Sequence, residues 1–548
     1  LNNRRPTAFA YGTIEGVAAV LERSLDRLSL VGPSRSSQLR QWSVLLPILA
    51  VANAIAFLLI QPGVNDLWAA RARANAAKHG VGLTYWFSWF GGGSTPGNYS
   101  VVTPYLSALI TPELVGALAA VAITPLAALL LRNTTYPLAG VSMATAAAGI
   151  NLWSGRVPFI LGCAFAVAAL LALTAQRRAW AVVLTLLCVF ASPVSGAFLA
   201  LGVAGFFIES KANRRISAIT VVTVAVGLGL VGLAFGTPGP EPFSFWLCLE
   251  TIGGLLLFLV ARPPAYLRTV IYLSIFAALV LVIVPNGMGS NFARMAWFCV
   301  PVAVVATSGR RLRVALLTTI PIMLLGANGT VQDLSAASQP VSQTSYYQPL
   351  ATELDRLHGL ANYRVEIVTH GAHAAYDALL DHAMLARGWE TQEDNALNKT
   401  LKNPQLDATS YKIWLDNNSV GYVAIPSKTD ESPEYTLVDE GLLPYLTEIW
   451  SSKDWILFRV ANPTPIVAPP QNVLEYSQSH LTIRVPCACT FSVRVRYSKF
   501  LRARPVPIPH VQPHGAATVI NDGYGYTSVT TTAPGDYIFQ GTVTKIFH

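Results

Sequence analysis

The sequence is dominated by apolar runs of about 15–21 residues, which recur from Trp42 to Ala327. Runs of this length match the number of helical residues that cross the hydrocarbon core of a bilayer. Charged residues make up only 12% of the chain, whereas they approach about a quarter in soluble domains. The pattern predicts a polytopic α-helical membrane protein and argues against a soluble enzyme.

We expect about eleven membrane-spanning helices, and the short loops between them test this number. The predicted spans are residues 42–61, 112–131, 138–154, 158–175, 179–192, 194–208, 216–236, 243–261, 269–285, 295–308 and 314–327. Cytoplasmic loops carry an excess of Lys and Arg. With a cytoplasmic N-terminus, the loops on that side hold Arg132, Arg177, Arg178, Lys211, Arg214, Arg215, Arg262, Arg268, Arg310, Arg311 and Arg313. The corresponding outside turns hold only Arg156 and Arg294, so an odd number of spans places the C-terminal region outside.

This charge distribution also predicts the location of the protein. We expect a multi-pass protein of the plasma (inner) membrane, with residues 1–40 as a cytoplasmic tail and no cleavable signal peptide, because no apolar core lies near the start. The net charge of +9 does not indicate nucleic acid, because most of the excess lies in short loops between apolar segments. The expected surroundings are therefore membrane lipid.

The first outside loop, residues 62–111, carries the densest set of chemically specific residues. It contains a lone acid, Asp66, then a basic helical stretch, then an aromatic run that includes Tyr85, Trp86 and Trp89. A Gly91-Gly92-Gly93 turn and the segment ending at Tyr99 follow. Loops of roughly 40 residues are usually functional or disordered, and the aromatic density argues against disorder. We therefore expect this loop to contribute to a functional site.

Several of these residues have a structural as well as a functional interpretation. Asp66 is a candidate general base, or an N-cap at the start of the following helix. Tyr85, Trp86 and Trp89 either stack on sugar faces or form an aromatic belt at the membrane interface. Glu250 lies inside the predicted eighth span, where an acid is a functional candidate or a hydrogen-bond partner of a neighbouring helix.

Arg156 and Arg294 are exceptions to the charge rule, because they lie at outside ends of predicted spans. One interpretation is that they reach toward lipid headgroups. The other is that one or both bind the phosphate of a lipid-linked substrate, because guanidinium groups suit phosphate oxygens and stay charged near lipid. Asn291, three residues before Arg294, is a further candidate for donor-phosphate binding.

The chain after residue 327 is polar and is predicted to form two further domains. Residues 328–348 are expected to be a linker and 349–465 an α/β domain, with strands at 363–368, 420–425 and 455–460 and helices at 349–358, 373–386, 408–416 and 442–451. Residues 466–548 alternate in polarity and contain turn signals, which predicts a β-sandwich. By analogy only, such outside modules often bind carbohydrate.

The cysteines and histidines do not indicate a metal site. Cys163, Cys188, Cys248 and Cys299 fall in or beside predicted spans and are interpreted as small buried apolar residues. Cys487 and Cys489 face the same side of a strand, as a local disulfide or as two free thiols. His370, His373 and His382 lack a recognised ligand spacing, so metal binding there is disfavoured.

A family resemblance rests on short motifs spread over most of the chain. They are Asp66, Phe90-Gly91-Gly92, Pro96-Gly97-Asn98-Tyr99, Trp153-Ser154-Gly155-Arg156-Val157-Pro158, Ser192-Pro193-Val194-Ser195-Gly196, Asn291-Phe292-Ala293-Arg294, Ala386-Arg387-Gly388-Trp389-Glu390 and Tyr411-Lys412-Ile413-Trp414-Leu415. With these motifs the chain resembles the GT-C class of integral membrane glycosyltransferases. Within that class it looks like actinobacterial envelope membrane proteins described as related to 6-pyruvoyl-tetrahydropterin synthase.

The resemblance implies transfer of a sugar from a polyprenyl-phosphate donor to a cell-envelope glycan or glycolipid acceptor outside the membrane. Asp66 would be the base, Arg294, Arg156 and Asn291 would bind the donor phosphate, and Tyr85, Trp86, Trp89, Tyr99 and Glu250 would contact substrate. Because envelope arabinofuranosyltransferases also combine a GT-C core with an outside β-domain, arabinofuranose or mannose is the expected sugar. Many GT-C enzymes carry a second acid beside the first, but Asn65 and Leu67 flank Asp66 here. No cofactor is therefore expected, and metal dependence is left open.

Two other functions remain as alternatives. A lipid or glycan transporter, or flippase, would show paired polar residues near the middle of the membrane and symmetry between its halves. Glu250 is the only clear candidate for a buried acid, and no repeat of the spans is visible. A non-catalytic envelope assembly protein would keep a degenerate transferase core and a glycan-binding domain.

Overall fold

The computed structural model describes residues 35–236, 239–368, 373–428, 432–441, 443–507 and 515–542. The predicted tail, 1–40, lies outside these residues except for its last six positions. The described chain divides into two units. Unit 1 comprises the described parts of Leu1–Pro62, Glu113–Leu230 and Glu241–Leu334, and unit 2 comprises those of Gly63–Pro112, Val231–Pro240 and Ser335–His548.

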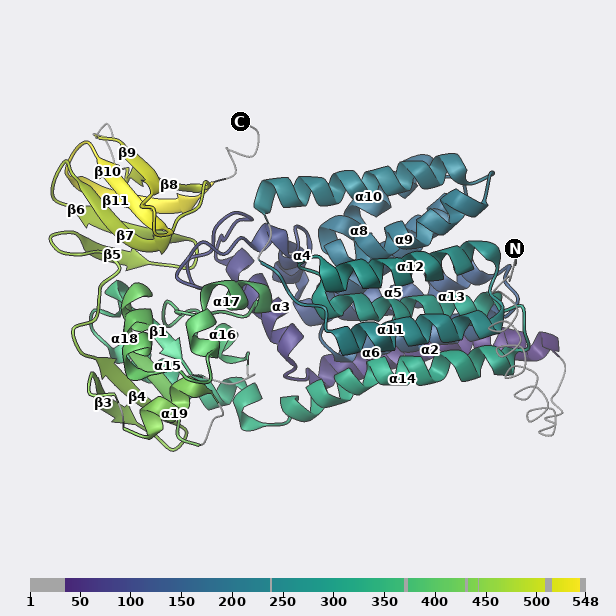
Figure 1. The fold of residues 1–548 in the computed structure, drawn as a ribbon, viewed down its shortest axis with the longest axis horizontal. Helices are drawn as coiled ribbons and strands as arrows, with labels where there is room; N and C mark the ends of the chain where they lie inside the picture. The colour runs from purple at the N-terminus through teal and green to yellow at the C-terminus, as the bar shows by residue number, and fades with distance from the viewer. Residues whose placement is uncertain are drawn as a thin grey trace, which may run out of the picture. The chain divides into compact units, whose positions relative to one another are not determined.

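Unit 1 is built from helices that lie side by side (Figure 1). They are α2 (Arg35–Ile60), α5 (Pro112–Leu131), α6 (Pro137–Trp153), α7 (Val157–Thr174), α8 (Arg178–Ala191), α9 (Pro193–Glu209), α10 (Arg214–Phe235), α11 (Phe245–Phe258), α12 (Ala265–Ile283), α13 (Val300–Thr307) and α14 (Leu312–Ala337). Short helical turns η2 (Leu259–Ala261), η3 (Gly289–Ala293) and η4 (Met295–Cys299) adjoin α11 and α13. Each of the eleven predicted apolar segments coincides with one of these helices.

The prediction of a polytopic helical membrane protein is confirmed, but the number of eleven spans is not. Among the described residues, six helical stretches are long and apolar enough to cross a membrane: Pro112–Leu131, Val157–Thr174, Arg214–Phe235, Ala265–Ile283, Gly289–Thr307 and Leu312–Ala337. A seventh results if Val44–Ile60 and Asn65–Lys78 form one broken span. Helices such as α8 and α9, with 14 and 17 residues, are shorter than the roughly 20 residues that a bilayer requires. The orientation of the chain in the membrane stays a prediction.

The predicted linker 328–348 is instead mostly helical. Helix α14 continues to Ala337, and η5 (Pro340–Ser342) and α15 (Thr344–Arg356) follow almost at once. The polar residues at the end of α14 have polar partners inside unit 1. The hydroxyls of Thr330 and Ser154 lie 2.5 Å apart, and Asp333 faces Arg156. The polar residues of this segment therefore belong to a helix and interact with polar partners, rather than forming a flexible linker.

Unit 2 contains the α/β domain predicted after the membrane region. Its mixed sheet has the order β1-β2-β4-β3, formed by β1 (Arg364–Ile367), β2 (Val420–Pro426), β4 (Trp455–Val460) and β3 (Leu446–Ser451). Strands β1 and β2 are parallel, whereas β4 is antiparallel to both β2 and β3. Around the sheet lie η6 (Leu360–Asn362), α16 (Ala375–Ala378), α17 (Thr391–Leu397), η7 (Lys399–Lys402), α18 (Ala408–Asn417) and α19 (Pro433–Asp439).

Two helix predictions in this domain are wrong. Residues 446–451 of the predicted helix 442–451 form strand β3, because Thr447, Ile449 and Trp450 suit a pleated edge and pair with β4. The predicted helix 373–386 is reduced to the single turn of α16. Val365 then bridges to Leu385, so the end of this segment continues the sheet rather than a helix.

The C-terminal region forms two antiparallel sheets that share one core, as the β-sandwich prediction requires. One sheet has the order β5-β6-β11-β8, with β5 (Asn472–Tyr476), β6 (His480–Val485), β11 (Gly535–Gly541) and β8 (Leu501–Pro505). The other has the order β7-β10-β9, with β7 (Thr490–Arg496), β10 (Tyr526–Thr531) and β9 (Ala517–Asn521). Cys487 and Cys489, left open above, are joined by a disulfide.

The first loop is part of unit 2 and is bound to both C-terminal domains. It contains α3 (Asn65–Lys78), η1 (Pro96–Asn98) and α4 (Thr103–Ile110). The buried guanidinium of Arg364, on β1, donates to the carbonyl oxygens of Gly91 at 3.0 Å and of Arg494 at 2.5 Å. Arg496, on β7, donates to the carbonyl oxygen of Phe90 at 2.7 Å. The glycine-rich turn is therefore the point where loop, α/β domain and sandwich meet.

Candidate functional site

Asp66 lies in unit 2, in the first turn of α3. The N-cap of this helix is Val64, so the N-cap interpretation of Asp66 is wrong: Asp66 is one residue inside the helix and is half-buried. The amide groups of a first helical turn favour a negative charge nearby.

The aromatic residues of the first loop form cores inside unit 2. Tyr85, Trp86 and Trp89 are each at most 1% exposed. The rings of Trp86 and Trp89 lie 4.2 Å apart, and the Tyr85 hydroxyl donates to the carbonyl oxygen of Arg496 at 2.7 Å. Neither sugar stacking nor a membrane belt is available to buried rings. Both interpretations are therefore wrong for these three residues, whose size and aromatic character serve packing instead.

Tyr99 belongs to a cluster that sequence reasoning missed. The guanidinium of Arg73, on α3, lies 4.0 Å from the centre of the Tyr99 ring and donates to the Glu390 carboxylate at 2.9 Å. Ser94 donates to the neighbouring Glu393 at 3.0 Å. Burial raises the pKa of Glu393 to about 8, and the charge of Glu390 adds to the rise. No sequence signal links positions so far apart.

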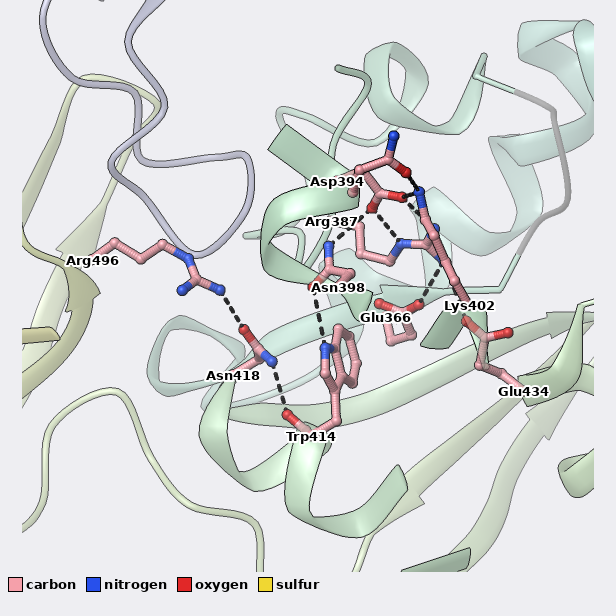
Figure 2. Close-up of polar contacts among 10 residues, drawn as sticks. Glu366, Arg387, Asp394, Asn398, Lys402, Trp414, Asn418, Glu434 and Arg496 are labelled. Atoms are coloured by element: carbon pink, nitrogen blue, oxygen red, sulfur yellow. Dashed lines mark hydrogen bonds and ion pairs between the residues drawn. The ribbon is translucent and has the colours of Figure 1, made fainter. Parts of the chain in front are cut away.

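A second buried charge cluster surrounds Arg387 in the α/β domain (Figure 2). The Arg387 guanidinium lies 3.1 Å from Asp394, 3.4 Å from Glu434 and 3.6 Å from Glu366. Lys402 binds the other side of Asp394 at 2.8 Å. Burial raises the pKa of Glu366 to about 8 even though Arg387 opposes the rise. This cluster connects β1, α17 and α19, so its role is structural.

Glu250 is not buried among the helices of unit 1. Its side chain on α11 is exposed in unit 1, and the indole nitrogen of Trp297 donates to it at 3.1 Å. The structural alternative, a hydrogen bond to a neighbouring helix, describes this residue. No observation supports substrate contact by Glu250.

Arg156 and Arg294, both in unit 1, each lie at the start of α7. Arg156 is the N-cap of this helix, is 14% exposed and has its guanidinium 3.8 Å from Asp333. The guanidinium of Arg294 lies 5.1 Å from the centre of the ring of Phe159, which follows Arg156 by three residues. Asn291 lies on η3, three residues before Arg294. At the start of α7, Arg156 therefore faces a carboxylate, and the Arg294 guanidinium lies over the ring of a first-turn residue.

An apolar cavity of about 420 Å³ begins beside this cationic end. It is lined by residues of α5, α6, α7, α9, α12, η4 and α13, and Phe159 is one of them. The polar lining residues gather at its two ends: Asn151 and Ser195 near Phe159, and Thr134, Thr174, Tyr266 and Thr307 at the opposite helix ends. A cavity of this kind suits a hydrocarbon chain, and the adjacent arginines suit an anionic group.

Metal ligation has no support among the described residues. There, no group of three or more His, Cys, Asp or Glu side chains is placed to hold a metal ion. His370 lies outside the described residues, and the nearby His382 has its Nδ1 2.9 Å from Asp355. The free thiols Cys163 and Cys299 line the apolar cavity, in agreement with their interpretation as small apolar residues.

Comparison with known proteins gives little additional information. No family model matches the sequence, and no curated protein matches it. Two solved structures of the Archaeoglobus fulgidus oligosaccharyltransferase are similar. One is tethered to an acceptor peptide with the NVT sequon, with 12% identity, a TM-score of 0.40, and coverage of 70% of this chain and 69% of that chain. The other, AglB with an inhibitory peptide and a dolichol-phosphate, has 12% identity, a TM-score of 0.40 and coverage of 71% and 69%. A likeness this small establishes neither a shared fold nor a shared activity.

Proposed function

We propose that this chain is a membrane glycosyltransferase of the GT-C type, which transfers a sugar from a polyprenyl-phosphate donor to an acceptor hydroxyl. The observation that carries the proposal is the position of the Arg294 guanidinium over Phe159, which lies in the first turn of α7 and lines an apolar cavity within the helices. Arg156 is the N-cap of the same helix. A polyprenyl phosphate has the complementary chemistry, because it joins an anionic group to a long hydrocarbon chain.

The arginines would act on the leaving group. When the acceptor oxygen attacks the anomeric carbon of the sugar, the bond from that carbon to the phosphate oxygen breaks and polyprenyl phosphate leaves with the electron pair. The leaving group needs charge stabilisation more than protonation, and positioned cationic donors supply it. Arg294 is the first candidate, Arg156 the second, and Asn291 a further phosphate ligand on the adjoining turn.

Asp66 would act as the general base. The acceptor hydroxyl loses its proton as the new bond forms, and a carboxylate within hydrogen-bond reach can accept it. Asp66 is half-buried in the first turn of α3, where the helix amide groups favour a negative charge nearby. Asp66 belongs to unit 2, whereas Arg156 and Arg294 belong to unit 1. The role of Asp66 is therefore tested by measuring the transfer rate of an Asp66 variant.

We further propose the outer side of the plasma membrane as the place of reaction. The acceptor would be a cell-envelope glycan or glycolipid, and arabinofuranose or mannose the sugar. The β-sandwich at the end of unit 2 would hold the glycan, as in other envelope transferases that carry such a domain. These finer assignments rest on the sequence resemblance alone.

The test uses purified full-length protein in lipid with a panel of radiolabelled polyprenyl-phosphate sugars and envelope glycan acceptors. We expect transfer from at least one donor, with a loss of about a hundredfold in Arg294→Gln and a smaller loss in Arg294→Lys. Arg215→Gln removes an exposed arginine at the start of α10 and serves as the matched control. Equal activity of Arg294→Gln and Arg215→Gln would refute the phosphate role, and no transfer from any donor would refute the proposed function.

A further inference from the structure

Asn151 is a buried amide on the cavity wall that has one unused hydrogen-bonding atom. It lies in the last turn of α6, is 3% exposed and lines the apolar cavity. Its Nδ2 donates to the carbonyl oxygen of Ala147 at 2.9 Å. Its Oδ1 is buried and accepts no hydrogen bond from any residue that the structure describes.

The orientation of this amide is fixed by its neighbour. A backbone carbonyl accepts hydrogen bonds and cannot donate them, so the atom that faces the Ala147 oxygen must be the nitrogen. Oδ1 therefore remains as the acceptor without a donor, on a residue that lines the cavity. Leaving a buried acceptor without a donor is unfavourable, so a donor from a ligand or a water is expected here.

The surroundings of Asn151 connect it to the cationic end of unit 1. The backbone nitrogen of Arg156 donates to the carbonyl oxygen of Asn151 at 3.3 Å. Phe159, which carries Arg294 on its ring, lines the same end of the cavity as Asn151. Ser195, also in the lining, donates to the carbonyl oxygen of Phe159 at 3.0 Å. Asn151 thus lies where an anionic head and an apolar chain would meet.

The chemistry of the missing partner follows from the donor proposed above. A phosphodiester, a fully ionised phosphate monoester and a prenyl chain have no hydrogen-bond donor to offer Oδ1, whereas every hydroxyl of a sugar ring is a donor. Resting on the proposed function, we infer that Asn151 Oδ1 accepts a hydrogen bond from a hydroxyl of the donor sugar. Asn151 is then a specificity-determining residue that distinguishes a sugar-loaded polyprenyl phosphate from the bare lipid.

The experiment measures lipid binding by the full-length protein in detergent micelles, without turnover. The probes are decaprenyl phosphate and the same lipid carrying arabinofuranose or mannose. We expect wild type to bind one loaded lipid more tightly than the bare lipid. Asn151→Leu should weaken binding of the loaded lipid about three- to tenfold, as expected for one neutral hydrogen bond, and leave the bare lipid unchanged.

Controls separate this role from a structural one. Asn53→Leu removes another amide of unit 1, whose Oδ1 already accepts a hydrogen bond from Trp153 at 2.9 Å. This control should change the affinities for the loaded and the bare lipid by the same factor. Arg294→Gln should weaken the binding of both lipids. If Asn151→Leu does not fold, Asn151→Ala is used in its place. If Asn151→Leu affects both lipids equally or neither, Oδ1 holds only a water and the inference is overturned. If wild type binds neither lipid, the proposed function itself fails.

Discussion

Arg73 and Glu390 form a buried ion pair between two segments that are 317 positions apart in the sequence. Arg73 Nη2 lies 2.9 Å from Glu390 Oε2, and the side chains are only 4% and 5% exposed. The pair connects α3, the helix that carries Asp66, to the start of α17 in the α/β domain. The first loop is therefore held as a structural part of unit 2.

Breaking this pair should destabilise unit 2 strongly. Glu390→Gln or Arg73→Met leaves one buried charge without its partner, which costs about 3–5 kcal/mol. Lys412→Met is the matched control, because the Lys412–Asp416 pair is 24% and 33% exposed and such pairs contribute about 1 kcal/mol or less. Unfolding followed by tryptophan fluorescence measures both. Equal losses in the two variants would contradict the structural role of the Arg73–Glu390 pair.

The pH dependence of stability should report Glu366. Its pKa is raised from an ordinary 4.5 to about 8 by burial, so the folded state keeps a proton that the unfolded state loses. The stabilisation that this protonated carboxyl provides is fully present below pH 4.5, where it does not vary with pH. It is lost progressively as the pH rises from about 4.5 to 8. Glu366→Gln should therefore stabilise the protein more at pH 8.5 than at pH 5, by on the order of a few kcal/mol.

The control for this prediction is Glu448→Gln, on the exposed edge strand β3. Unfolding midpoints of wild type and both variants are compared at acidic and alkaline pH. Glu448→Gln should leave the pH profile of wild type unchanged. A Glu366→Gln profile that runs parallel to that of wild type would show that this carboxyl ionises normally in the folded protein.

Gly92 should tolerate no side chain. Its φ of +86° favours glycine, and a Cβ there would lie 2.7 Å from the Tyr85 hydroxyl oxygen, which is itself bound to Arg496. We expect Gly92→Ala to cost about 1–3 kcal/mol in unfolding free energy. Gly82→Ala, whose Cβ would meet nothing within 4 Å, should change it by less than about 1 kcal/mol. Similar thermal midpoints for the two variants would exclude a tight turn at Gly92.

The helices of unit 1 could be predicted because their signal is local. Long apolar runs bounded by charged or proline-containing turns mark a helix whatever lies next to it, and every predicted run coincides with a helix. The number of true spans could not be predicted as well. Length alone does not decide whether short helices such as α8 and α9 cross a membrane.

The residues that were misjudged depend on distant partners. The aromatic run of the first loop has the composition of a membrane belt or a sugar site, but Trp86 and Trp89 pack in a core with residues of the α/β domain, among them Trp455. Strand β3 has a mixed pattern that only its pairing with β4 resolves. Glu390 and Glu393 gain their raised pKa from burial beside Arg73 and Ser94, which no sequence spacing indicates.

The most direct test of the account compares wild type with Asp66→Asn in sugar transfer from polyprenyl-phosphate donors to envelope glycans. Glu113→Gln, a substitution in the first turn of α5, is the control. We predict transfer by wild type and by the control, and a loss of at least about a hundredfold in Asp66→Asn, as expected when a general base is removed. Undiminished transfer by Asp66→Asn would contradict the catalytic role of Asp66, and a folded wild type that transfers no sugar would contradict the account as a whole.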